Sequence, residues 1–190
     1  MQKTIHQAAT DGDLDAITYH CAHSDVNQES REYYTPLQLA SKQGHTDVVH
    51  ALIDAGADTN ARHFGHWTPL MFAARNGHVD CMRMLINNHA DIEAQDLTHA
   101  RAIHHAAEFK HTDCVALLRD HQADIQAITC EKKDILDYAK SNKDQELLGY
   151  LEGIEFQQKP RQEWVAGPTY QDPFSGKTHY GPLVRKVQQM

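Results

Sequence analysis

The sequence lacks the features that mark several common protein classes. It has no apolar run near the roughly 20 residues that a membrane-spanning helix needs, so we expect no membrane span. Only 18 basic residues stand against 26 acidic ones, so we expect no general nucleic-acid binding, which needs a positive surface. The first residues, Met-Gln-Lys-Thr-Ile-His, form no apolar signal core, and a cytoplasmic location is expected.

Cysteine is scarce and shows no spacing typical of a disulfide framework or a zinc site. The four cysteines are Cys21, Cys81, Cys114 and Cys130, and no two of them form a Cys-x-x-Cys pair. We expect Cys81 and Cys114 to be small buried apolar side chains. This usage of cysteine indicates a reducing compartment.

Catalytic motifs are also missing. The sequence contains no Gly-x-Ser-x-Gly, no phosphate-binding loop and no Gly-x-Gly-x-x-Gly. Its 15 histidines suggest a metal site, but neighbours such as His104 and His105 point about 100° apart on a helix and have no cysteine at zinc-binding range. We therefore expect no enzyme activity, no metal and no cofactor.

What the sequence does contain is one unit repeated at a fixed period. Two sets of residues recur at the same constant spacing: Asp25, Asp58, Asp91 and Asp124, and Ala40, Ala73, Ala106 and Ala139. Self-similarity at a period of about 33 residues indicates a stack of like supersecondary units rather than one globular core. The recurring aspartates are expected to hold the backbone of a turn.

The fullest copy reads TPLQLASKQGHTDVV and then LIDAGADTNA, over residues 35–61. Thr35-Pro36 is typical of a helix start, and Gly44 and Gly56 are typical of helix ends. The copy resembles the ankyrin repeat, whose pattern is Thr-Pro-Leu-His-x-Ala, Gly-His, Leu-Leu, then Gly-Ala-Asp-x-Asn. The resemblance implies an all-α solenoid of helix-turn-helix units joined by extended β-turn fingers, followed by a non-repeat C-terminal tail.

The resemblance covers residues 2–153, which divide into an N-terminal cap (2–27), repeats at about 30–62, 63–95 and 96–128, and a C-terminal cap (129–153). A monomer is expected. The third copy is degenerate, because Lys110 replaces a glycine, while His89 and Gln122 stand at the position of Gly56. A non-glycine residue in a left-handed conformation costs on the order of 1 kcal/mol, so the C-terminal half is expected to be less stable.

Two further roles are implied by the resemblance. His45, His78 and His111 occur once per repeat at the turn between helices, where similar proteins use histidine for structural hydrogen bonds. Asn60 stands at a position that asparaginyl hydroxylases modify in similar proteins. A turn asparagine bonded to its own backbone is the favoured interpretation of Asn60.

In similar proteins, partners lie against the concave face made by the turn tips and first helices. Trp, Tyr and Arg are enriched among binding hot spots, and arginines on this face would suit an acidic stretch of a partner. Trp67 has an alternative role, packing on its neighbouring finger. The resemblance predicts a protein-protein interaction module, an adaptor or inhibitor, with these candidate partner-binding residues: Tyr34, Arg62, Phe64, Trp67, Arg75, Asn76 and Phe109.

The tail, residues 154–190, has a different composition. It contains four of the six prolines and five aromatic residues after the periodicity stops. Aromatic residues are uncommon in solvating tails, so a partner-binding segment or one folded back on the repeats is favoured over a disordered tail. An alternative function follows, in which the protein is an effector or immunity-type protein whose specific activity resides in the tail.

Overall fold

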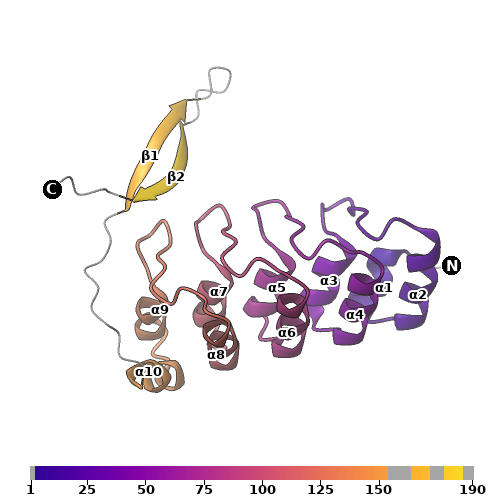
Figure 1. Cartoon of the computed structure of the whole chain (residues 1–190), viewed down its shortest axis with the longest axis horizontal. Helices are drawn as coiled ribbons and strands as arrows, with labels where there is room; N and C mark the ends of the chain where they lie inside the picture. Colours follow the sequence, from indigo (N-terminus) through magenta and orange to yellow (C-terminus); the bar gives the residue numbers. More distant parts are fainter. Residues whose placement is uncertain (1–2, 154–163, 172–177, 186–190) are drawn as a thin grey trace. The chain divides into compact units, whose positions relative to one another are not determined.

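The computed structural model describes residues 3–153, and the backbone of residues 164–171 and 178–185. The chain divides into two compact units, Met1–Gly153 and Ile154–Met190. The first unit is a row of helix pairs with an extended finger between successive pairs (Figure 1). The second unit contains a two-stranded hairpin. No helix within the described ranges is long and apolar enough to cross a membrane.

The first unit confirms the predicted all-helical solenoid, with ten helices in the described residues. Its helices come in five pairs: α1 (Ile5–Asp11) with α2 (Leu14–His23), α3 (Pro36–Gln43) with α4 (Thr46–Asp54), α5 (Pro69–Arg75) with α6 (Val79–Asn87), α7 (Ala102–Glu108) with α8 (Thr112–Asp120), and α9 (Ile135–Ser141) with α10 (Gln145–Glu152). Each pair forms one unit of the stack.

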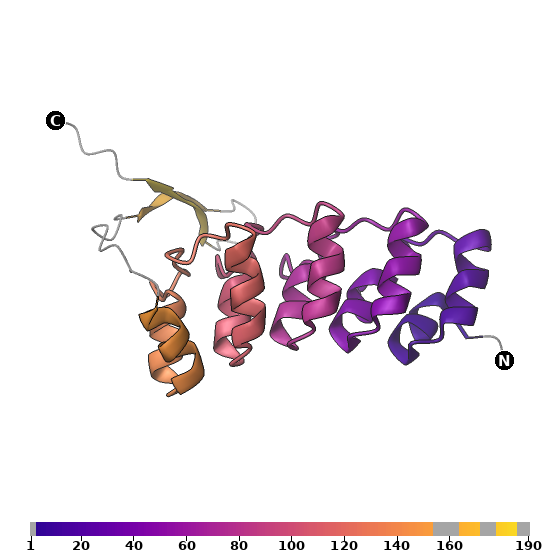
Figure 2. The ribbon, with the colours of Figure 1, turned by 60° about the horizontal axis from the view of Figure 1, so that its bottom comes forward.

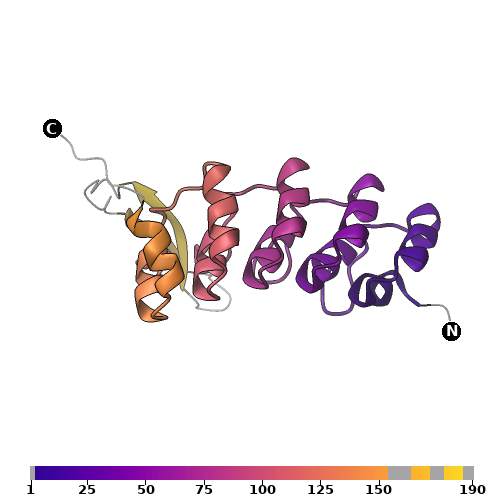
Figure 3. The same ribbon diagram turned by 90° about the horizontal axis from the view of Figure 1, so that it is seen from below.

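The pairs stack so that first helices contact first helices and second helices contact second helices. Figures 2 and 3 show the resulting two rows side by side along the unit. The alanine that recurs once per repeat is fully buried in every copy, because a small side chain is needed where neighbouring first helices meet. The recurring leucines of the second helices complete this core: Leu52, Leu85, Leu118 and Leu151.

The start of α3 shows how the repeat motif folds locally. The hydroxyl of Thr35 accepts a hydrogen bond from the backbone N–H of Gln38 at 3.3 Å, and the Gln38 amide oxygen accepts from the Thr35 N–H at 2.9 Å. Pro36 lies in the first turn, where its missing N–H has no partner to lose. The Gln38 amide also donates to the carbonyl of Ala61 at 2.9 Å, which ties the helix to the next finger.

The histidine between the helices of each repeat makes the structural hydrogen bond that the resemblance implied. His78 Nε2 lies 3.2 Å from the carbonyl oxygen of Lys42 in the preceding repeat. His45 and His111 make the same contact, with Thr10 at 2.9 Å and Arg75 at 3.0 Å. Each of these histidines therefore joins two neighbouring units.

The recurring aspartates hold turns, as predicted. Asp58 accepts a hydrogen bond from the backbone N–H of Asn60 at 2.8 Å. The expectation for Asn60 itself was wrong, because its side chain bonds to the next repeat rather than to its own backbone. Its amide donates to the carbonyl of His89 at 3.1 Å and accepts from the N–H of Asp91 at 2.7 Å.

Left-handed backbone occurs where the degenerate copies lack glycine, as the sequence predicted. The φ angles are 65° at His89, 66° at Gln122 and 63° at Lys110, against 87° at Gly56. Four more non-glycine residues near the finger tips have positive backbone φ, which the sequence did not predict: Tyr33, His66, His99 and Lys132. They occupy the same position in successive fingers, so this conformation belongs to the finger and not to one residue type.

Cys81 on α6 and Cys114 on α8 are buried, which confirms the prediction for these two residues. Burial raises the pKa of the Cys114 thiol to about 12, so this group stays protonated and behaves as an apolar side chain. Cys130 is exposed and lies in the last finger.

The tail contains a hairpin of β1 (Trp164–Gln171) and β2 (Thr178–Arg185), which no sequence pattern predicted. The strands are antiparallel, and Trp164 pairs with Arg185 at one end while Gln171 pairs with Thr178 at the other. Register shifts occur on both sides of Gly167. The aromatic side chains that suggested a partner-binding tail lie outside the described residues.

Candidate functional site

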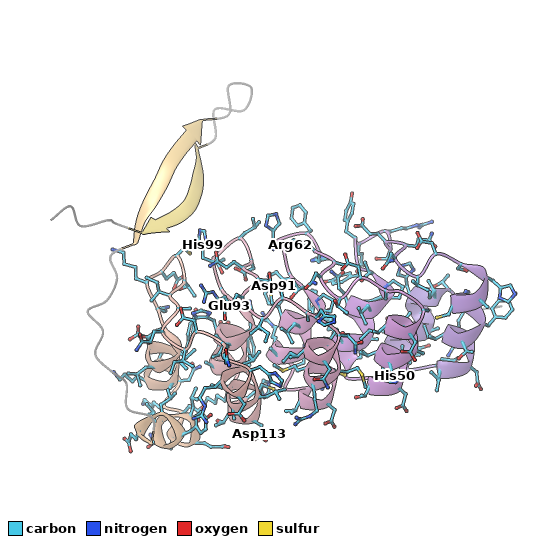
Figure 4. All side chains as sticks on the ribbon, in the orientation of Figure 1. His50, Arg62, Asp91, Glu93, His99 and Asp113 are labelled. Atoms are coloured by element: carbon cyan, nitrogen blue, oxygen red, sulfur yellow. The ribbon has the colours of Figure 1, made fainter. Side chains whose placement is uncertain are left out.

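The predicted partner-binding residues lie on the surface formed by the fingers and the first helices, which we call the inner face. The fingers supply Tyr34, Arg62, Phe64 and Trp67, whereas Arg75 ends α5, and Asn76 and Phe109 follow α5 and α7 directly. Figure 4 shows Arg62 and His99 at the finger edge of the unit, and His50 and Asp113 at the opposite edge, on second helices.

An aromatic cluster runs through the inner face and includes two residues that the sequence did not single out, His63 and Phe72. The rings of Tyr34 and His63 stack, with their centroids 4.0 Å apart. Phe72 lies 5.7 Å from Tyr34 and 5.2 Å from Trp67, also between centroids. Phe72 is buried, so it holds two half-buried rings from successive fingers in place.

Trp67 also packs on the following repeat. Its ring lies 4.1 Å from that of His105 on α7, measured between centroids. This contact differs from the alternative role predicted for Trp67, packing on its neighbouring finger, because His105 belongs to a helix; Trp67 remains partly exposed. Truncation of Trp67 would disturb the stack as well as the surface.

Two cations of the inner face lie over aromatic rings. The Lys42 ammonium is 5.2 Å from the centre of the Tyr34 ring. The Arg75 guanidinium carbon is 5.3 Å from the centre of the Trp67 ring and 4.2 Å from that of Phe109. Such contacts are worth about 0.5–1 kcal/mol at exposed sites. Arg75 thus links aromatic residues of two successive repeats.

The structure does not bring all the predicted residues into this cluster. Arg62 donates to the carbonyl of Gln95 in the next finger at 3.4 Å, away from the stacked rings. The Asn76 amide donates to the carbonyl of Phe72 at 2.8 Å and so finishes its own helix. Phe64 is 82% exposed in its finger and makes no ring contact that the described residues show.

Exposed apolar side chains concentrate on the inner face. Besides Phe64, the finger residues Tyr33 and Leu97 are 61% and 63% exposed, and Phe109 is 39% exposed. Phe64 and Leu97 occupy the same place in successive repeats. The sequence showed the 33-residue spacing of these two residues, but it could not show that both side chains are exposed.

A buried histidine–aspartate pair lies beneath Trp67. His105 Nε2 is 3.0 Å from Asp96 Oδ2, and both side chains are almost completely buried. The same carboxylate accepts from the backbone N–H groups of Thr98 at 2.7 Å and Ala100 at 3.0 Å. Burial acts to raise the pKa of Asp96, but the hydrogen bonds from His105 and Thr98 outweigh burial and lower it.

His104 and His105 have separate partners, as their helical spacing predicted. His104 Nδ1 accepts from the Arg101 N–H at 3.1 Å, and its Nε2 donates to the Ala127 carbonyl at 2.9 Å. Burial lowers the pKa of His104 to about 4, which keeps the ring neutral. Across the described residues, no three histidine, cysteine or acidic side chains form a group that could hold a metal ion.

The second-helix face differs in charge from the inner face. An acidic residue lies in the first turn of every second helix: Asp15, Asp47, Asp80, Asp113 and Glu146. There it interacts favourably with the helix dipole. A shallow depression of about 360 Å³ lies on this face, and its lining includes Asp47, His50, Asp54 and Met84.

Comparison with known proteins identifies the repeat. A family profile described as "Ankyrin repeats (3 copies)" matches residues 5–96, and one described as "Ankyrin repeats (many copies)" matches residues 76–119. The chain is 44% identical over 54 residues to human "Ankyrin repeat domain-containing protein 7". This match covers 27% of the chain and 21% of that protein, so the chain spans about a fifth of the relative's length. The matches and the stacked helix pairs show that the chain belongs to the ankyrin repeat family.

Proposed function

We propose that this protein is an adaptor or inhibitor that holds one protein partner on its inner face. Ankyrin repeats generally mediate protein-protein interaction. The observation that supports this particular face is the cluster of Trp67, Arg75 and Phe109, in which one guanidinium lies against two rings. In this proposal the protein acts as a monomer in the cytoplasm, without cofactor or catalytic residues.

The stacking of Arg75 favours binding because it orders the side chain before the partner arrives. Immobilising a flexible side chain at an interface costs about 0.5–1.5 kcal/mol, and a cation already held on rings loses less freedom. Aromatic residues and arginine are also the most frequent hot-spot residues. Phe64, Tyr33 and Leu97 extend the apolar surface along the fingers.

The test is an affinity pull-down with mass spectrometry on the full chain and on Phe109→Ala. Phe109 is 39% exposed, so its truncation should remove contact area and leave the repeat stack folded. Tyr19→Ala is the matched control, because Tyr19 is 48% exposed on α2 and lies outside the inner face. We expect a partner that the full chain and Tyr19→Ala retain and Phe109→Ala loses. A partner retained equally by all three proteins would contradict the inner-face proposal.

The hairpin of β1 and β2 supports a second candidate, an effector or immunity-type protein whose specific activity resides in the tail. It is an element of regular structure outside the repeats, which a simple solvating tail does not need. A chain that ends at Gly153 tests this candidate in the same pull-down. Loss of the partner from the shortened chain, with its helical circular dichroism intact, would favour the tail over the inner face.

A further inference from the structure

We propose that the inner face selects an acidic segment of its partner and places two carboxylates of that segment against Lys42 and Arg75. This inference rests on the proposed function and names the chemistry of the partner. It is supported by a cation that lies over an aromatic ring in two successive repeats, and by an acidic residue at the same position in the third repeat.

The recurring arrangement is a cation over an aromatic ring. Lys42 and Arg75 occupy the same position in successive repeats, as do the rings beneath them, Tyr34 and Trp67. The two cation-to-centroid distances are nearly equal, 5.2 Å and 5.3 Å. The inner face therefore presents two cations in line, one repeat apart, on an apolar base.

Neither cation has an acidic partner within residues 3–153, whereas others in that range do. Lys3 pairs with Asp11 and Asp13 at 3.1 Å and 2.9 Å, and Lys133 pairs with Glu131 at 2.6 Å. Lys42 and Arg75 contact rings instead, which leave their N–H groups able to donate to an incoming oxygen. A carboxylate matches these donors, and the planar guanidinium of Arg75 can bind one through two parallel hydrogen bonds.

The third repeat carries the opposite charge at the same position. Glu108 corresponds to Lys42 and Arg75, and Ala100 corresponds to the rings of Tyr34 and Trp67. The Glu108 side chain is 46% exposed, so its charge reaches the surface. An acidic segment would be attracted by the first two positions and repelled by the third. This order of charges sets both the register and the direction of the segment.

The chain's own tail is a poor match for this surface. Residues 154–190 contain five basic residues, Lys159, Arg161, Lys177, Arg185 and Lys186, against three acidic ones, Glu155, Glu163 and Asp172. The net charge of −8 does not oppose an acidic partner locally, because the acidic first turns belong to the second helices. The segment is therefore assigned to another protein.

The test is selection of random peptides, displayed on phage, against the immobilised full chain. We expect enrichment of Asp and Glu over the unselected library. Selection against Lys42→Glu/Arg75→Glu should enrich Lys and Arg instead. The matched control is Arg83→Glu/Arg119→Glu, which changes the net charge equally on the second helices and should keep the acidic preference. A synthetic acidic peptide from the first selection should bind Lys42→Glu/Arg75→Glu at least about tenfold more weakly than the wild type.

The outcomes separate this inference from the proposed function. Selected peptides without acidic enrichment that still require Phe109 would overturn the inference and leave inner-face binding intact. Acidic peptides that bind Phe109→Ala and Lys42→Glu/Arg75→Glu as tightly as the wild type would overturn both. A selection that enriches no peptide over the empty support would also overturn the inference, and the pull-down would then decide the proposed function. Circular dichroism of each variant confirms that it is folded.

Discussion

A Cβ atom added to Gly44 would lie 2.5 Å from Nδ1 of His78 in the following repeat. That distance is too short for any real contact, so the ring of His78 occupies the space that only a glycine leaves free. The imidazole needs this position to reach the carbonyl of Lys42 at 3.2 Å. Gly44 and His78 therefore form a glycine–histidine pair that joins two repeats.

The glycine–histidine pair recurs along the stack, and where it is absent both of its residues are replaced. Gly12 with His45 and Gly77 with His111 show the same close approach, at 2.7 Å in each case. In the next repeat, Lys110 replaces the glycine and Asp144 replaces the histidine. Asn142 then takes over the contact, because its amide donates at 2.7 Å to Glu108, the carbonyl equivalent to that of Lys42.

We predict that Gly44→Ala destabilises the protein more than Gly56→Ala does. Both glycines have left-handed backbone, with φ of 81° and 87°, and share a conformational cost of about 1 kcal/mol. Only Gly44 faces a neighbour, since nothing lies within 4 Å of a Cβ on Gly56. Urea denaturation measures the two losses in the free energy of unfolding. In a His78→Ala background the difference should shrink, and an undiminished difference would refute the pairing.

We predict that His104→Gln weakens the acid sensitivity of the fold. The folded-state pKa of His104 is lowered from 6.5 to about 4, so the unfolded chain takes up a proton at higher pH than the folded one. Its contribution is therefore complete above about pH 6.5 and is lost as the pH falls toward 4. At about 1.4 kcal/mol per unit, that loss is at most on the order of 3 kcal/mol.

Glutamine is the right replacement because Gln38 holds the equivalent position. Gln38 accepts from Thr35 and donates to Ala61, just as His104 accepts from Arg101 and donates to Ala127. His104→Gln should thus keep both hydrogen bonds without a titrating group. The free energy of unfolding, measured by urea denaturation from pH 7 to pH 4.5, should fall less in the variant than in the wild type. Equal slopes would contradict this assignment, since the other histidines are common to both proteins.

We predict that His105→Leu is strongly destabilising and that Asp96→Ser rescues it. Removal of His105 leaves Asp96 Oδ2 buried without its hydrogen-bond partner, and breaking a buried pair in this way costs about 3–5 kcal/mol. The first repeat has Ser30 and Leu39 at these two positions, and the Ser30 hydroxyl accepts from Glu32 and Tyr34 as Asp96 accepts from Thr98 and Ala100. The double variant should therefore recover most of the loss in thermal denaturation. A double variant no more stable than His105→Leu would show that the pair is not exchangeable.

We predict that Gln122→Gly slows hydrogen exchange in the C-terminal half of the repeats. Gln122 has φ of 66°, and glycine at such a helix end relieves up to about 1 kcal/mol of strain. Hydrogen-exchange mass spectrometry should show stronger protection of α8, α9 and α10 in the variant. Gln43→Gly is the control, because Gln43 is the last residue of α3 and does not have positive φ, so glycine there relieves no strain and should weaken protection. Unchanged exchange at α8–α10 would mean that Gln122 is not a weak point of the stack.

Much of the fold was predictable because each repeat is built from local signals. Thr35 and Pro36 start a helix, Gly44 ends it, and the same order recurs in the next repeat, so the helix pairs follow from neighbouring residues alone. The hairpin of the tail was not predictable in the same way, since Pro168 and Pro182 fall inside its strands and proline normally argues against a strand.

The candidate site was only half predictable. The resemblance to ankyrin repeats placed Tyr34, Trp67, Arg75 and Phe109 on one face. The sequence could not reveal that Arg62 donates a hydrogen bond to the next finger, that Asn76 caps its own helix, or that Asp96 is the partner of His105. These facts depend on side-chain directions within a finger, which the period of the sequence does not encode.

The sequence by itself determined the repeat and the order of its helices, because a fixed period with local start and stop signals specifies each helix pair. The resemblance of its motif to the ankyrin repeat indicated the family. Only the tertiary structure decided which cations of residues 3–153 have no acidic partner in that range. Lys42 and Arg75 each lie over a ring of their own repeat, and the stacking of α3 on α5 brings these two cation–ring pairs onto one surface. Charge complementarity is a property of such a surface, so it emerges from packing between repeats.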